Sequence, residues 1–178
     1  MKRTLDNDSE PINKKRKCTE NNGYTAYSYI LVIIDMQTKF NSSNDKNTIS
    51  EVNKLILQAK TDKAFIVIAQ YMNFGKTHKE FNTLVKKYKP HAYAIANQCD
   101  KSRAIETKLL SHRARAPFIK VCGVNTDACV QSTVKGLCKI IMPDMKIQVV
   151  KNACNACCNV CHRNGINIMS KLPNVVVI

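Results

Sequence analysis

Short apolar runs alternate with segments of helical periodicity along most of this chain. The run at residues 29–34 has the length and continuity of a strand that is buried on both faces. Similar runs predict strands at residues 29–34, 64–69, 92–96, 117–122, 146–150 and 175–178. Apolar residues spaced three and four apart predict helices after residues 48 and 77, over 103–113, from 129 and over 155–171. Such alternation with short connections favours right-handed βαβ units, so we expect an α/β fold with a mostly parallel sheet and helices on both faces.

Two of these helices begin with the Thr-x-x-Glu spacing of a capping box. The first pair is Thr48 and Glu51, and the second is Thr77 and Glu80. In a capping box the threonine side chain accepts a hydrogen bond from the backbone amide three residues later. We therefore expect Thr48 and Thr77 to cap the first and second helices.

The first 23 residues differ in composition from the rest of the chain. They are polar, charged and rich in asparagine, so we expect a disordered tail ahead of one domain over residues 24–178. Lys2-Arg3 and the basic run at residues 14–17 are separated by ten residues, the spacing of a bipartite nuclear import signal that would bind an acidic import receptor. The alternative is a basic tail that keeps the protein soluble or touches nucleic acid without specificity.

No apolar run approaches the length of a membrane span, and the N-terminus lacks the apolar region of a secretion signal. We therefore expect a cytoplasmic protein with no membrane partner, or a nuclear one in a eukaryotic host. The nine cysteines are an odd number, and we interpret them as mostly free thiols in a reducing compartment.

The protein is strongly basic, with a formal net charge of +15. Such a charge attracts anions, which include nucleic acid, an acidic protein partner and a carboxylate substrate. Lysine-rich faces that keep the protein soluble explain the charge equally well. Nucleic-acid binding has the least support, because the sequence lacks a recognition motif or interleaved aromatic residues.

Two predicted strand ends carry reactive side chains. Asp35 directly follows the first strand, and Cys129 stands where a strand and a tight turn lead into a helix. The positive end of a helix dipole should lower the pKa of a thiol placed there, and the free N–H groups can hold an oxyanion. For most of the other cysteines a small buried apolar side chain is the better interpretation.

The segments around these two residues resemble the isochorismatase-like cysteine hydrolase superfamily. Residues 31–37 with Phe40 are similar to its opening motif, and residues 122–133 are similar to its nucleophile motif. The resemblance covers residues 24–178 and implies a three-layer αβα sandwich with a Rossmann-like sheet. It also implies a Cys-Lys-Asp triad and an assembly of identical subunits.

By this resemblance Cys129 is the nucleophile, and Asp35 takes its proton and later returns it to the leaving group. A lysine lowers the pKa of the thiol and balances the charge. The resemblance further implies a cis peptide at Val124-Asn125, which would turn the amides of Asn125 and Cys129 into an oxyanion hole.

The triad lysine has two candidate positions. Counting back from the helix that carries Thr107 reaches Asn97, whereas Lys101 is the nearest lysine. With Lys101 the triad is complete. With Asn97 in its place, Cys129 loses its cationic partner and activity is weak or absent.

The histidines argue against one branch of the superfamily. Nicotinamidases carry an Asp-x-His arrangement and a further histidine before the lysine, but neither His78 nor His91 has an aspartate two residues earlier. We therefore expect no metal at the active site and no other cofactor.

A cysteine-rich segment near the C-terminus is a separate candidate for metal binding. Its pattern is Cys154-x-x-Cys157-Cys158-x-x-Cys161-His162, a spacing known from zinc sites. Within one helix these residues would share a face and pack as small core side chains. Zinc binding by this segment is thus a secondary hypothesis.

The leading hypothesis is a hydrolase that acts on a small amide, carbonyl or enol-ether substrate. Phe40, Tyr71, Asn73 and Asn125 lie at or just beyond strand ends and are the candidate substrate-binding residues. An enol ether would use Asp35 more than Cys129, and the basic body suits an anionic substrate. The alternative is a catalytically weakened domain of the same fold, kept as a binding or regulatory protein in a nucleus or a virus.

Overall fold

The computed structural model describes residues 23–142 and 145–178. The two basic clusters of the predicted import signal lie outside these residues. Among the described residues, no helix is long and apolar enough to cross a membrane.

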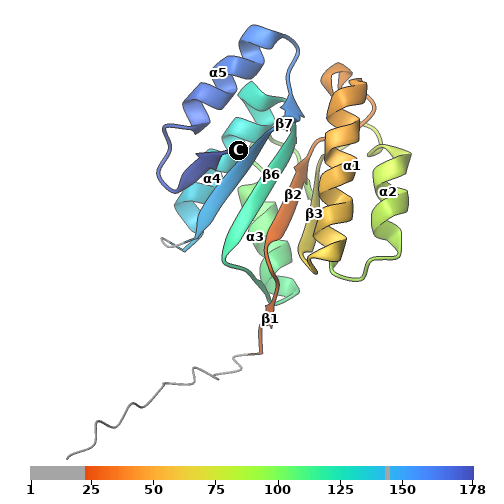
Figure 1. The fold of residues 1–178 in the computed structure, drawn as a ribbon, viewed down its shortest axis with the longest axis vertical. Helices are drawn as coiled ribbons and strands as arrows, with labels where there is room; N and C mark the ends of the chain where they lie inside the picture. The colour runs from red at the N-terminus through yellow and green to blue at the C-terminus, as the bar shows by residue number, and fades with distance from the viewer. Residues whose placement is uncertain (1–22, 143–144) are drawn as a thin grey trace, which may run out of the picture.

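Six parallel strands form the central sheet (Figure 1). Their order across the sheet is β4-β3-β2-β6-β7-β8, and every neighbouring pair is parallel. The strands are β2 (Ile30–Ile34), β3 (Phe65–Tyr71), β4 (His91–Ala96), β6 (Phe118–Val124), β7 (Lys146–Asn155) and β8 (Val175–Val177). These are the six strands that the apolar runs predict. A separate short parallel pair, β1 (Thr25–Ala26) with β5 (Ala114–Arg115), was not predicted.

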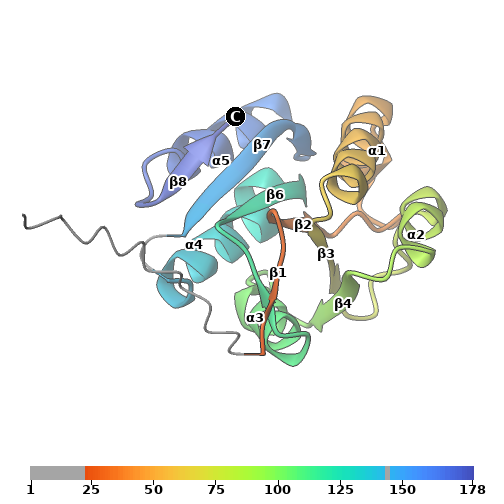
Figure 2. The same cartoon turned by 60° about the horizontal axis from the view of Figure 1, so that its bottom comes forward.

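Five α-helices cover the two faces of the sheet, with α1 and α2 on one face and α3, α4 and α5 on the other (Figures 1 and 2). They are α1 (Lys46–Thr61), α2 (Lys79–Lys86), α3 (Ser102–Ser111), α4 (Gln131–Ile140) and α5 (Asn159–Met169). A 3₁₀ turn at Asn41–Asn44 precedes α1, and a π-helical turn at Thr126–Val130 leads into α4. The predicted three-layer αβα sandwich is confirmed.

The core explains why the strand signals in the sequence are continuous runs. Strand β2 lies between β3 and β6, with helices above and below, and all five of its residues are buried. A strand in that position has no face that water reaches, so each of its positions favours an apolar residue.

Both predicted capping boxes are wrong. Helix α1 begins at Lys46, and its cap is Asp45, whose carboxylate accepts hydrogen bonds from Thr48 N and Thr48 Oγ1, both at 2.8 Å. Thr77 Oγ1 instead accepts a hydrogen bond of 2.6 Å from Gln70 Nε2, and His78 occupies the capping position of α2 without a side-chain bond. In each case the threonine hydroxyl forms its hydrogen bond with a nearby side chain instead of with the helix end.

The last predicted helix begins later than its sequence pattern indicates. Strand β7 continues to Asn155 after its pairing with β6 shifts register, and α5 starts only at Asn159. Cys154 is therefore a buried strand residue, whereas Cys157 and Cys158 lie exposed in the turn before α5. The interpretation that these cysteines share one helix face is wrong, and among them Cys154 alone packs in the core.

Candidate active site

The site lies where the chain changes direction across the sheet. From the central strand β2 the chain first adds β3 and β4 on one side, and it then crosses over to add β6, β7 and β8 on the other. In such sheets a crevice forms at the carboxyl ends of the two strands between which the order reverses. Asp35 directly follows β2, and the segment that carries Cys129 directly follows β6.

Asp35 is held rigidly at the end of β2. Its backbone has a φ of +51°, a left-handed conformation that aspartate tolerates better than most residues. Asp35 N donates a hydrogen bond of 2.9 Å to Ala69 O, and Gln37 N donates one of 2.7 Å to Asp35 O. The side chain is fully buried, so its carboxylate is fixed in a place that solvent does not reach.

Lys101 is the cation that meets this carboxylate. Its side chain is 0% exposed, and Lys101 Nζ lies 2.8 Å from Asp35 Oδ2. The ammonium also donates hydrogen bonds to the carbonyl oxygens of Gln98 (3.1 Å) and Cys99 (3.4 Å), and it lies 4.9 Å from the centre of the Tyr71 ring. These partners together compensate the loss of hydration of a buried positive charge.

Asn97, the other candidate for this position, is exposed. It lies just beyond β4, whereas Lys101 stands at the capping position of α3. Among the described residues, therefore, the structure brings Lys101 rather than Asn97 to Asp35.

Cys129 lies in the π-helical turn before α4 and is 4% exposed. Its thiol lies near enough to Asp35 and Lys101 for their charges to shift its pKa. Burial raises the pKa of the Cys129 thiol strongly, the negative charge of Asp35 raises it further, and Lys101 lowers it only in part. The net shift is therefore opposite in direction to the lowering expected from the helix start, and burial is its largest cause.

Burial also raises the pKa of Asp35, and Lys101 and the Cys129 thiol oppose that shift. The upward shift of its pKa favours the protonated form of the Cys129 thiol beside the Asp35–Lys101 pair. Transfer of the thiol proton to Asp35 would move the negative charge from oxygen to sulfur without changing the net charge of the site. The Lys101 ammonium can stabilise either form, which is the electrostatic requirement for proton exchange in a dry pocket.

Thr133 links the loop that carries Lys101 to the helix that follows Cys129. Its Oγ1 accepts a hydrogen bond of 3.1 Å from Lys101 N and donates one of 3.1 Å to Cys99 O. Close packing of α4 against this loop also needs Gly136, because a Cβ there would come within 2.3 Å of Ser102 Oγ. Sequence reasoning missed Thr133, although its place four residues after Cys129 puts it on the same side of the helix.

The peptide bond between Val124 and Asn125 is cis, the geometry that the resemblance implies. Asn125 Oδ1 accepts a hydrogen bond from Ser42 Oγ, which ties this segment to the turn before α1. Gly123 has a φ of +120°, and a Cβ there would lie 2.0 Å from Ile34 O. Only glycine allows β6 to approach β2 so closely next to Asp35.

Three aromatic rings lie together beside the ion pair. The Phe40 and Phe74 rings are 4.2 Å apart, and the Phe74 and Tyr71 rings are 6.0 Å apart with an edge-on arrangement. Phe40 and Tyr71 were predicted to bind substrate, whereas Phe74 was not. The predicted Asn73 is exposed in the turn after β3 with a φ of +59°, so its visible role is to form the turn.

The predicted absence of an active-site metal remains a prediction. His78 Nε2 lies 3.2 Å from Ser43 Oγ, and His91 Nδ1 contacts Tyr88 O. In the described part of the chain, the group of side chains close enough together to share an ion is a set of three cysteines at the start of α5.

The fold is a parallel αβα sandwich of the Rossmann-like class, with a buried cysteine, lysine and aspartate near its strand ends. The Isochorismatase domain family matches residues 29–178 of the chain. The chain therefore belongs to this family, and that membership supports a hydrolase.

Solved structures with the same fold share little sequence with this chain. The nicotinamidase SaPncA from Staphylococcus aureus is 13% identical, with a TM-score of 0.72 over 85% of this chain and 99% of that one. The MAR1 ribonuclease from Caenorhabditis elegans is 14% identical, with a TM-score of 0.72 over 86% of this chain and 79% of that one. An isochorismatase-like hydrolase from Alkaliphilus metalliredigens is 14% identical, with a TM-score of 0.64 over 84% and 94%. A comparison with curated protein sequences gave no match.

Proposed function

We propose that this protein is a cysteine hydrolase that cleaves a small amide or a related carbonyl compound. The observation that carries the proposal is the fully buried ion pair of Asp35 and Lys101, whose charged atoms are 2.8 Å apart, beside the buried Cys129 thiol. A buried ion pair is weak evidence for stability, because desolvation offsets much of its attraction. Its position next to a thiol at the strand ends favours a chemical role.

The reaction begins with transfer of the Cys129 proton to Asp35. The thiolate then attacks the carbonyl carbon of the substrate, and the backbone N–H groups of Asn125 and Cys129 receive the negative charge that forms on oxygen. Asp35 returns the proton to the departing nitrogen, which leaves as an amine and gives a thioester on Cys129. Asp35 next takes a proton from water, whose oxygen attacks the thioester, and the same proton finally restores the thiol.

Lys101 keeps its proton throughout this sequence. Its ammonium is anchored by two carbonyl oxygens and by Asp35, so it can stay in place while the negative charge moves between oxygen and sulfur. This role needs a fixed cation and no proton transfer, and it fits a side chain that contacts neither solvent nor a second acid.

The aromatic group of Phe40, Phe74 and Tyr71 supports a substrate with a planar apolar part. Phe40 lies in the loop after β2 and Phe74 in the turn after β3, whereas Tyr71 is the last residue of β3 and its ring lies 4.9 Å from Lys101 Nζ. A flat group that stacks on them would place a carbonyl substituent near the thiol.

Hydrolysis of an enol ether is a second candidate reaction at the same site. It requires an acid that protonates the substrate, and burial raises the pKa of Asp35 in the direction that favours its acid form. In this case Cys129 would not form a bond to the substrate.

Two variants of the full chain separate the reactions. Ammonia release from a panel of small aromatic and aliphatic amides is measured beside hydrolysis of an isochorismate-like enol ether. For an amide substrate we expect Cys129→Ala and Asp35→Asn each to lower kcat/KM by about 10⁴-fold or more. Cys138→Ala, a cysteine on the far part of α4, is the matched control and should keep full activity.

Loss of activity in Asp35→Asn alone, with Cys129→Ala still active, would assign the enol-ether reaction instead. If the native protein hydrolyses neither class of compound, the hydrolase proposal fails and the binding-protein alternative takes its place.

A further inference from the structure

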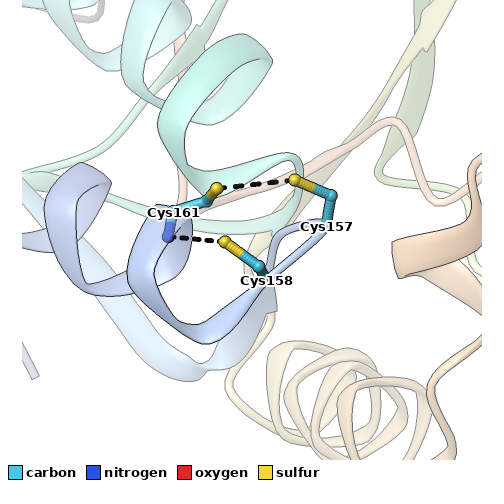
Figure 3. Close-up of side chains that lie close together, drawn as sticks. All are labelled: Cys157, Cys158 and Cys161. Carbon is cyan, nitrogen blue, oxygen red and sulfur yellow. Dashed lines mark hydrogen bonds between the residues drawn. The ribbon is translucent and has the colours of Figure 1, made fainter.

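Three cysteine side chains converge at the start of α5, outside the site described above (Figure 3). We call Cys157, Cys158 and Cys161 the thiol cluster. Their sulfur atoms all lie within 4.8 Å of one another. Cys157 and Cys158 are exposed and Cys161 is partly buried, so the cluster is open to solvent.

Local backbone geometry brings the three sulfurs together. Cys158 is the N-cap of α5 with an extended backbone, and its Sγ accepts a hydrogen bond of 3.1 Å from Cys161 N. Cys157 Sγ donates to Cys161 Sγ at 3.5 Å across the same turn. The strand-to-helix junction thus aims three sulfurs at one point, although their spacing in sequence is only 1 and 3 residues.

The three sulfurs of the cluster lie close enough to interact directly. Three thiolates at these separations would repel one another. A cation at the same point would neutralise all three, which is how thiolate clusters take up metal ions.

The distances fit a small d¹⁰ cation. Zinc-to-thiolate bonds of about 2.3 Å in a tetrahedron hold sulfurs roughly 3.8 Å apart. The 3.5 Å separation of Cys157 and Cys161 and the 4.8 Å limit of the cluster lie on either side of that value. Thiolates select Zn²⁺ or Cu⁺ and disfavour Mg²⁺ and Ca²⁺, which require oxygen ligands.

Two neighbours that the sequence pattern groups with these cysteines do not belong to the cluster. Cys154 is buried in β7, and His162 Nδ1 is 2.9 Å from Thr126 Oγ1. Three protein ligands leave the fourth tetrahedral position to solvent.

We propose that Cys157, Cys158 and Cys161 bind one Zn²⁺ ion through three thiolates, with water at the fourth position. Binding replaces up to three thiol protons, which pass to the buffer, and involves no oxidation or reduction. The proposal does not depend on the hydrolase activity proposed for Cys129.

The position of the cluster gives bound zinc a structural effect. Asn155, the last residue of β7, donates a hydrogen bond of 3.2 Å from Nδ2 to Ser42 O, and Ser42 Oγ in turn donates to Asn125. Helix α5 reaches the same segment through the contact of His162 with Thr126. Zinc in the cluster would hold the turn before α5 in place. The elements on both sides of that turn, β7 and α5, contact the segment that leads to Cys129.

A competition titration on the full chain tests the proposal. Chelator-treated protein, kept reduced with a phosphine, is titrated with Zn²⁺ against a chromophoric chelator, and proton release is followed in weak buffer. We expect one tight site per chain. Serine at Cys157, Cys158 or Cys161 should each lower the affinity by more than the roughly 10- to 100-fold that loss of an outer-shell partner costs.

Cys138→Ser and Cys129→Ala are the matched controls, and both should bind zinc as the native chain does. Co²⁺ in the same site should show thiolate-to-metal charge-transfer absorption, and each cluster variant should weaken it. Zinc binding that survives the triple serine variant would overturn the assignment, and so would binding that is lost in Cys129→Ala. Binding of Cu⁺ without binding of Zn²⁺ would overturn the choice of metal.

Discussion

Cys129 and the thiol cluster follow neighbouring strands, β6 and β7, at the carboxyl ends of the sheet, yet their surroundings differ sharply. Cys129 is a single buried thiol that faces a carboxylate and an ammonium. The cluster is exposed, and its sulfurs face one another and a backbone amide. The comparison teaches that the neighbours of a thiol decide its chemistry: a dedicated proton acceptor favours nucleophilic attack, and a second and third thiol favour metal binding.

The strongest test of the comparison removes each of the two sites in turn by mutation. Cys129→Ala should lower kcat/KM by about 10⁴-fold or more and leave zinc affinity unchanged. The triple serine variant of the cluster should lose zinc binding and change kcat/KM by no more than about tenfold. Kinetics and zinc titration on both variants check this, and a similar loss of activity in the two would contradict the separation of roles.

Removal of the Lys101 charge should have the next largest effect. Lys101→Met leaves Asp35 buried without its partner, which should lower the free energy of unfolding by about 3–5 kcal/mol. The double variant Asp35→Asn with Lys101→Met should recover much of that loss, because no uncompensated charge remains. Urea unfolding of the single and double variants measures the coupling, and additive losses would show that the two side chains do not act as a pair.

The stability of Lys101→Met should also change with pH in a defined direction. Burial raises the folded pKa of Asp35, so ionisation of this group lowers stability as the pH rises above its unfolded pKa of about 3.9. Lys101 opposes that shift in the native protein. In Lys101→Met the stability should therefore fall more steeply with rising pH than in the native chain, and parallel pH curves would contradict the assignment.

Thr133→Val should have an intermediate effect confined to the buried site. It leaves Lys101 N and Cys99 O without their shared partner, which costs about 1–3 kcal/mol. If Thr133 positions the lysine loop, kcat should fall more than KM changes, and Thr133→Ser should restore both kcat and stability. Failure of serine to rescue kcat would show that the hydroxyl does not position the loop.

Thiol labelling distinguishes the two environments directly. Cys157 and Cys158 are exposed, and burial raises the pKa of Cys129, so a neutral alkylating reagent should modify the first two at least about tenfold faster near pH 7. Labelling of Cys129 should keep rising with pH through the neutral range. Mass spectrometry of timed samples checks the order, and labelling of Cys129 first would show a stabilised thiolate in the resting site.

Cys158→Ser should have the smallest effect on stability. Serine is a preferred N-cap, so its hydroxyl can accept the bond from Cys161 N and hold the free energy of unfolding within about 0.5 kcal/mol of the native value. Thermal unfolding without metal measures this, and a loss above about 2 kcal/mol would show that the cluster is structural rather than a ligand set.

The fold could be predicted because its signals are local. Buried strands must be apolar throughout, as β2 is, and this pattern needs no knowledge of partners. Helix starts were harder, since Asp45 rather than Thr48 caps α1, and the start of α5 depends on how far β7 pairs with β6. Boundaries of this kind are decided by contacts between elements.

The candidate site divides in the same way. Asp35 and Cys129 stand at the ends of strands and could be located from motifs. Lys101 could not be separated from Asn97, because its position depends on a loop that Thr133 holds from another helix. The direction of the Cys129 pKa shift depends on burial and on Asp35, and neither effect follows from the helix start alone.

The bonds from Thr133 have a consequence for how this protein can diverge. The helix that follows Cys129 also holds the loop of Lys101, so a small displacement of α4 carries both groups together and preserves their separation. Surface loops around them are then free to accept substitutions and insertions. Reactive geometry of this kind can survive while most of the surrounding sequence is replaced.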